Sequence, residues 1–192
     1  MKSMVLMLFV SAFVISSAGC RKSPWRAERY IDEKTEKVIW SQQFPSYGEY
    51  EDYFVNGAFI ELRIKAHNET LHTANAPYYL IINGVGFSGK HKRLRIHNLN
   101  LTSDLNHRYD ISNTLSGFPI EYEFRIYEDR PEFVIAHCRF HKDLYLDFAA
   151  NETLTFMLDV EVLMVDGGAQ RKQIKCDFTP KLEQGDYQMI HH

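Results

Sequence analysis

The chain has few of the sequence features that usually assign a protein to a functional class. It contains only three cysteines in 192 residues, no internal repeat and no low-complexity tract. After the N-terminal stretch no apolar run reaches transmembrane length. The formal net charge is −3, and this mild acidity argues against nucleic-acid binding, which usually needs a strongly basic domain. A length of 192 residues fits one domain with a short additional segment.

The N-terminal segment carries the most specific signal in the sequence. Lys2 is followed by an apolar run, residues 4–15, which only Ser11 interrupts. A helix of this length rises about 18 Å, too little for a hydrocarbon core of about 30 Å. A short apolar run between a basic start and small residues indicates an export signal rather than a membrane span.

Ala18 and Gly19 directly precede Cys20, and this order resembles the lipobox of bacterial lipoproteins. The resemblance implies that residues 1–19 are a signal peptide and that lipid is attached to the sulfur of Cys20. Arg21, in place of aspartate, resembles lipoproteins sent to an outer membrane, facing the periplasm. The alternative is an ordinary secretory signal cut after Ala18, which would leave Cys20 as a free thiol.

The other cysteines are Cys138 and Cys176. An odd thiol is a liability in an oxidising compartment, so a lipid on Cys20 would leave a pair that can be oxidised. We therefore predict a disulfide between Cys138 and Cys176. It would close a loop of 38 residues, which the loop-entropy model values at about 3–4 kcal/mol. The alternative is that both are small buried hydrophobic side chains.

The mature chain divides into a charged segment and a β domain. Residues 20–37 are mostly charged and weakly periodic, which predicts a lipid-anchored tether with an average reach of about 25 Å. Residues 38–190 are dominated by period-two alternation. Short strands and the absence of a long helical pattern predict an all-β fold, an antiparallel β-sandwich of immunoglobulin-like type. The predicted strands are 38–40, 58–66, 78–83, 93–101, 120–128, 132–138, 144–148, 154–165 and 173–178.

Local patterns predict details of this fold. The apolar alternation changes phase inside 93–101, as a β-bulge near residues 97–98 would produce. An Asp-Gly pair at 166–167 predicts a tight turn between the last strands. Residues 84–89 match G-x-G-x-x-G, but a strand pattern rather than a helix follows them. A glycine-rich hairpin is therefore expected there instead of a dinucleotide site.

Two segments have the composition of a contact surface. Residues 44–54 combine tyrosines with carboxylates, which suits recognition, although the rings could instead fold back over the end of the sandwich. Residues 90–97 form a basic cluster that could meet an acidic partner or lipid headgroups, or could protect an edge strand. The residues expected to contact a partner are Tyr47, Tyr50, Tyr53, Lys90, Lys92, Arg93 and Arg95.

The sequence shows no catalytic motif. Its carboxylates lie on the polar faces of predicted strands, and the histidines show no metal-ligand spacing. We predict no catalytic residue, no metal and no cofactor. The expectation is a lipid-anchored binding protein of the bacterial envelope, either an immunity protein against a periplasmic toxin or an accessory of an envelope machine. The alternative is an envelope enzyme or small-ligand carrier, which a concave pocket with several titratable groups would favour.

Overall fold

The computed structural model of the protein describes residues 22–38, 43–70, 73–107, 109 and 117–188. Within these residues the protein is all-β, with one short 3-10 turn and no α-helix. The predictions for residues 1–21, including Cys20, lie outside the described residues, as does most of the predicted strand 38–40. The elements are β1 (Lys22–Asp32), η1 (Glu51–Tyr53), β2 (Phe54–Val55), β3 (Ala58–Ala66), β4 (Thr73–Ala74), β5 (Tyr78–Phe87), β6 (His91–Ser103), β7 (Ile120–Glu123), β8 (Arg125–Tyr127), β9 (Arg130–Leu144), β10 (Leu154–Met164) and β11 (Ala169–Gln188).

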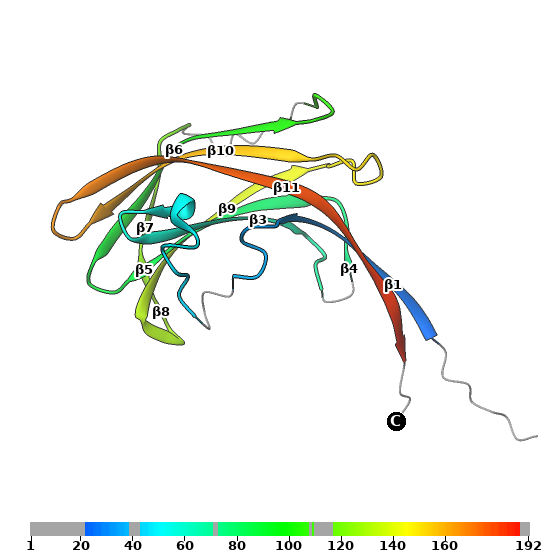
Figure 1. Cartoon of the computed structure of the whole chain (residues 1–192), viewed down its shortest axis with the longest axis horizontal. Coiled ribbons are helices and arrows are strands. Elements are labelled where there is room, and N and C mark those ends of the chain that lie inside the picture. The colour runs from blue at the N-terminus through cyan, green and yellow to red at the C-terminus, as the bar shows by residue number, and fades with distance from the viewer. Residues whose placement is uncertain (1–21, 39–42, 71–72, 108, 110–116, 189–192) are drawn as a thin grey trace, which may run out of the picture.

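The strands form two sheets (Figure 1). A six-stranded sheet has the order β4-β1-β11-β10-β6-β7, and a five-stranded sheet has the order β2-β3-β5-β9-β8. The described strand pairs are antiparallel except for β1 with β4, which is parallel. The all-β prediction is confirmed, and so is the predominance of antiparallel pairing.

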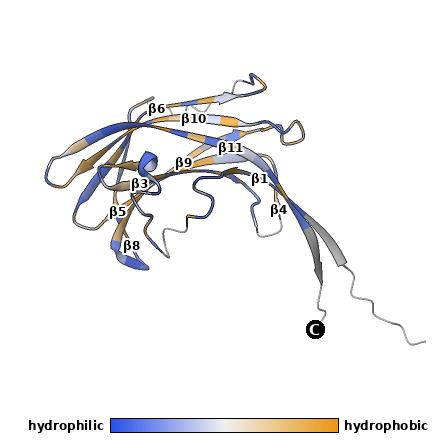
Figure 2. Ribbon diagram, in the orientation of Figure 1, coloured by the Kyte–Doolittle hydropathy of each residue, from blue (hydrophilic) through white to orange (hydrophobic). Residues whose placement is uncertain are grey.

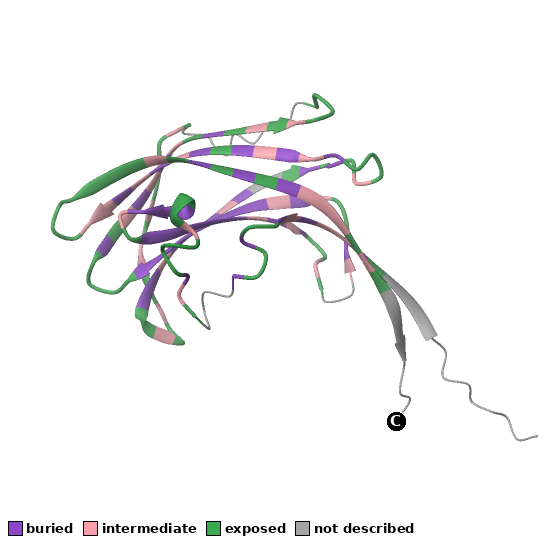
Figure 3. Cartoon of the chain, viewed as in Figure 1, coloured by how far each residue is buried: buried purple, intermediate pink, exposed green. Residues whose placement is uncertain are grey.

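One hydrophobic core joins both sheets. Leu154, Phe156 and Leu158 of β10 are at most 1% exposed, and they are the side chains that period-two alternation assigns to one face. Buried residues alternate with more exposed ones along β6 and β10, whereas β3 and β5 are buried at almost every position (Figure 3). Apolar residues lie along the strands, whereas the turn after β8 is hydrophilic (Figure 2). The core therefore follows the alternation of the sequence.

The predicted bulge and the predicted tight turn are both confirmed. In the pairing of β10 with β6, Asp159 lies opposite Asn98 and Val160 opposite Ile96, so His97 is the extra residue. Between β10 and β11, Gly167 has a φ of 93°, which glycine adopts without steric cost. Local sequence signals were sufficient for both features.

The charged segment 20–37 is not a coil over its described part. Residues 22–32 form β1, which pairs with β11 from Lys22–Gln188 to Asp32–Phe178. The far ends of these two strands extend beyond the sheets as a ribbon (Figure 1). Its charges pair across the strands, as in the ion pair of Arg29 with Glu183. The tether prediction was wrong here because a solvent-exposed strand pair and a flexible coil have the same charged amino-acid composition.

The predicted disulfide is also wrong, because Cys138 and Cys176 are free and buried. Cys138 lies in β9 of the five-stranded sheet, opposite Ile82. Cys176 lies in β11 of the other sheet, opposite Phe156. Each thiol is a small core side chain at most 1% exposed, as the alternative interpretation had it. Burial raises the pKa of Cys138 to about 11, which makes this thiol unreactive in the folded state.

Two segments were predicted as a hairpin and as one continuous strand, but each passes from one sheet to the other. The glycine-rich segment ends β5 in the five-stranded sheet, and β6 begins in the six-stranded sheet, so this turn is not a hairpin. The predicted strand 120–128 divides at Phe124 into β7 and β8, which belong to different sheets. A Cβ atom on Gly84 would lie 3.0 Å from Phe124 and 3.2 Å from Leu94. The glycine thus allows close packing between the sheets.

Candidate functional site: the aromatic end

The three tyrosines expected to contact a partner have different surroundings. Tyr47 is 58% exposed, and its hydroxyl donates to Glu51 (3.2 Å). Tyr50 is half-buried and packs edge-on against Phe59. Tyr53 is 2% exposed and donates to Asp32 (2.7 Å). The prediction for Tyr53 was therefore wrong, because its ring completes the core at the edge of β3.

Phe44 is the centre of an aromatic cluster at one end of the molecule. Its ring stacks on Phe133 at 5.4 Å and 15°. It also meets Phe87 at 4.6 Å and Phe54 at 5.9 Å. Tyr47 packs against Phe54 at 5.4 Å. We call these five residues the aromatic end. They come from a loop, from β2, from the end of β5 and from the start of β9, so only the fold brings them together.

Cations border this aromatic end. Lys90 Nζ lies 5.8 Å from the centroid of the Phe87 ring, and Arg130 Cζ lies 4.9 Å from that of Phe133. Such placement over a ring face is attractive. The Lys90 carbonyl accepts the N–H of Val165 (2.8 Å), which holds the β10–β11 turn against it. The aromatic loop and the start of the basic cluster, far apart in the sequence, therefore form one surface.

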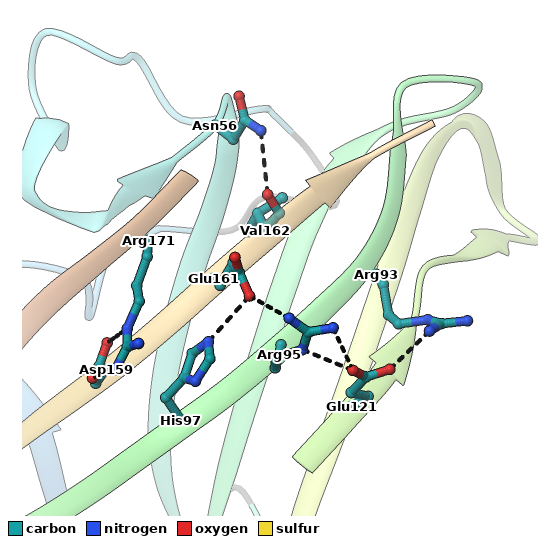
Figure 4. Close-up of polar contacts among 9 residues, drawn as sticks. All are labelled: Asn56, Arg93, Arg95, His97, Glu121, Asp159, Glu161, Val162 and Arg171. Carbon is teal, nitrogen blue, oxygen red and sulfur yellow. Dashed lines mark hydrogen bonds and ion pairs between the residues drawn. The ribbon is translucent and has the colours of Figure 1, made fainter. Parts of the chain in front are cut away.

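A buried histidine fixes the turn that carries Phe87 and Lys90. His91 is 5% exposed. Its Nδ1 accepts the N–H of Phe87 (2.9 Å), so its Nε2–H donates to the carbonyl of Asn56 (3.1 Å). The Asn56 side chain in turn donates to the Val162 carbonyl at 3.2 Å (Figure 4). Gly86 makes room for the ring, because a Cβ there would lie 2.6 Å from His91 Cγ.

The remaining part of the basic cluster is paired within the protein. Arg93 and Arg95 each bind Glu121, at 2.8 and 2.7 Å, and Arg95 also binds Glu161 at 2.7 Å (Figure 4). The hydrogen bonds of His97 and Arg95 hold the pKa of Glu161 below its ordinary value. This ladder of alternating charges crosses β7, β6 and β10. Arg93 and Arg95 are therefore not free cations, whereas Lys90 and Lys92 are exposed and form no ion pair with a described residue.

A pocket of about 410 Å³ lies elsewhere, between β1 and β3. Its lining includes the titratable side chains of Asp32 and Glu61, which are 5% and 1% exposed. Glu61 accepts a hydrogen bond from Asn83 (3.0 Å) and lies 2.5 Å from an Arg63 nitrogen. The sequence did not indicate this pocket, because the residues that line it belong to separate strands.

Among the described residues no group of three or more His, Cys, Asp or Glu side chains could hold a metal ion. The same residues include no helix long and apolar enough to cross a membrane. Comparisons with protein-family models, curated proteins and solved structures find no match for the chain. The fold class, an all-β protein with two sheets, is therefore known from the structure itself.

Proposed function

We propose that the protein is a lipid-anchored binding protein of the bacterial envelope, facing the periplasm, that contacts another protein through its aromatic end. One observation carries the proposal: the aromatic end and the beginning of β1 lie at opposite ends of β11. The turn before Ala169 meets Lys90, whereas Lys22 pairs with Gln188. The 20 residues of β11 span at most about 66 Å. A lipid on Cys20 would thus present the aromatic end away from the membrane.

The composition of the aromatic end supports protein contact. Tyr47 and Phe87 are 58% and 37% exposed, and their rings rest on the buried rings of Phe54 and Phe133, respectively. Tyrosine and arginine, present at the aromatic end as Tyr47 and the bordering Arg130, are among the residue types that contribute most to binding at protein interfaces. Lys90 and Lys92 favour a partner with carboxylates at the matching position. Anchoring raises the effective concentration near the membrane, so a modest interface is sufficient.

The scaffold of this proposal is an immunoglobulin-like sandwich, and its partner is a protein of the envelope. A periplasmic toxin that the protein neutralises fits this description, and so does a component of an envelope machine. In both cases the contact is protein–protein and needs no catalytic group.

Capture experiments with paired variants test the proposal. The full chain, purified from envelopes in detergent, serves as bait beside a Tyr47→Ala/Phe87→Ala variant. Tyr145, which is 68% exposed just after the far end of β9, provides the matched control Tyr145→Ala. We expect one partner to be captured by the wild type and the control, with affinity about 30-fold lower for the double variant. Equal capture by the three proteins, or capture of nothing, would refute the proposal.

The anchor has its own test. Mass spectrometry of the mature N-terminus is expected to find lipid on Cys20. An unmodified start at Gly19 or Cys20 would remove the anchor from the proposal and leave the contact surface to be judged separately.

A further inference from the structure

The pocket between β1 and β3 is lined by strand edges that are hydrogen-bonded to no other strand of the described residues. β2 pairs only with Ala58 and Phe59 of β3, so residues 60–66 have no described strand beside them on that side. β4 pairs only with Arg26 and Ala27 of β1, so residues 28–32 also have no described strand hydrogen-bonded to them there. The ends of this stretch are bonded in other ways, because the Tyr78 hydroxyl donates to the Glu28 carbonyl and the Thr35 and Glu36 N–H groups donate to the Asp32 carbonyl. The described sheets thus end at two open edges that face one pocket.

Hydrogen bonds show which backbone groups of β3 point to the open side. The Ala66 N–H donates to Glu69 Oε2 (3.2 Å), not to β5, so Ala66 points outward. Backbone groups alternate in direction along a strand, so those of Leu62 and Ile64 point outward as well. The Glu69 carboxylate closes the edge at Ala66 only. Leu62 and Ile64 both line the pocket.

Apolar and charged side chains alternate along this edge of β3. Leu62 and Ile64 belong to the core face, with Phe178 beside them in the pocket. Glu61, Arg63 and Lys65 belong to the other face. Glu61 is 1% exposed, yet its Oε1 makes no hydrogen bond with a described residue and has only the Arg63 ion pair. Lys65 has no ion pair with a described residue. The carboxylate of Glu61 is therefore matched by Asn83 and Arg63. The pocket still offers the outward backbone groups of Leu62 and Ile64 and the ammonium group of Lys65, which no described residue pairs.

We propose that this pocket binds an extended peptide segment of a partner protein as an added strand on β3. Backbone groups of the peptide would bond Leu62 and Ile64, as in other strand additions to an open edge. Its apolar side chains would alternate with polar ones, the apolar ones facing Leu62, Ile64 and Phe178. A carboxylate of the peptide would lie near Lys65. This site is distinct from the aromatic end and needs neither it nor the lipid.

The competing interpretation is that the charges only protect the edge. Charged side chains along an open edge discourage pairing with other chains. In that case the edge would bind no extended peptide, and the charges of Glu61, Arg63 and Lys65 would act by repelling strands. A binding experiment separates the two interpretations directly.

The probe is a displayed library of random linear peptides, selected on the full chain in detergent. We expect the enriched peptides to alternate apolar and polar residues and to carry an acidic residue. Binding of such a peptide should slow hydrogen exchange at the Leu62 and Ile64 amides. Methylating the backbone nitrogens of the peptide should abolish binding, because its donors are then lost.

Charge-reversal variants complete the test. Lys65→Glu is expected to weaken the selected peptide about tenfold, whereas Lys92→Glu, at the other end of the molecule, should leave it unchanged. The Tyr47→Ala/Phe87→Ala variant should also bind normally, so failure here and failure of the proposed function are distinguishable. Peptides without alternation, equal binding to Lys65→Glu, or self-association of the chain through this edge would each overturn the proposal.

Discussion

The contact between Gly86 and His91 predicts a large penalty for a single added methyl group. In Gly86→Ala the new Cβ would lie 2.6 Å from His91 Cγ, so the buried ring must move. The ring would lose its bonds to Phe87 and Asn56, at about 1 kcal/mol each. Overpacking adds about 1–3 kcal/mol, and replacing glycine in a strand returns about 0.5–1 kcal/mol. We expect the free energy of unfolding to fall by about 2–4 kcal/mol.

A double-mutant cycle in urea tests this reasoning. His91→Ala alone should be destabilising, but in that background Gly86→Ala should cost almost nothing, because the ring is absent. The coupling energy between the two positions should be about 2–4 kcal/mol. Gly48→Ala is the matched control, since no atom lies within 4 Å of its Cβ position. Additive effects, within about 0.5 kcal/mol, would show that the ring does not depend on this glycine.

Three further predictions concern the buried and paired groups. Without reductant, Cys138 and Cys176 should both react with a thiol reagent in the unfolded protein, and neither should react in the folded protein. Failure of either cysteine to react after unfolding would contradict the assignment of both as free thiols. Glu152 is 0% exposed, and although burial raises its pKa, hydrogen bonds from Ser103 and Tyr109 lower it below the ordinary value. The stabilisation that the Glu152 carboxylate contributes should therefore be complete above about pH 4.3 and disappear as the pH falls through the lower folded pKa. Glu152→Ala should lower the free energy of unfolding by about 1–3 kcal/mol at neutral pH, because the donors of Ser103 and Tyr109 lose their acceptor. It should also remove part of the pH dependence, and a variant as stable as the wild type would contradict this. Glu161→Gln should lower the free energy of unfolding by less than about 1 kcal/mol in urea titrations, because the partners of Glu161 are partly exposed. The loss should be smaller in high salt. A larger loss that does not depend on salt would contradict this prediction.

Individual strands could be predicted from the sequence, because the alternation of apolar and polar residues within one strand is a local signal. β3 was predicted with the bounds Ala58–Ala66 that it has, and the bulge at His97 followed from a change of phase within β6. β1 could not be found in this way. Its partner in β11 lies more than a hundred residues away in the chain, and only that partner makes a charged, weakly alternating segment into a strand.

Assignment to a sheet was the information that the sequence lacked. A strand pattern continues through Phe124 without interruption, although the chain changes sheets there. The disulfide prediction failed because Cys138 and Cys176 both follow the pattern of inward-facing core residues, and that pattern carries no information about whether two such residues meet. The aromatic end could be predicted only in part. Tyr47 and Lys90 were identified separately, but their common surface depends on Phe87 and Phe133, which no sequence pattern connects with them.

The change from a coil to a paired strand alters what an anchor on Cys20 would do. A flexible tether would let the domain sample many heights and orientations, and so reduce its local concentration at any one of them. β1 begins at Lys22 and is paired from there with Gln188, so at most a short linker would separate the lipid from a two-stranded ribbon. A ribbon restrains direction as well as distance. The aromatic end would then be held at a restricted distance from the membrane, which suits a partner that is itself fixed in the envelope better than one that diffuses through the periplasm. Of the two partner classes, this geometry favours the component of an envelope machine.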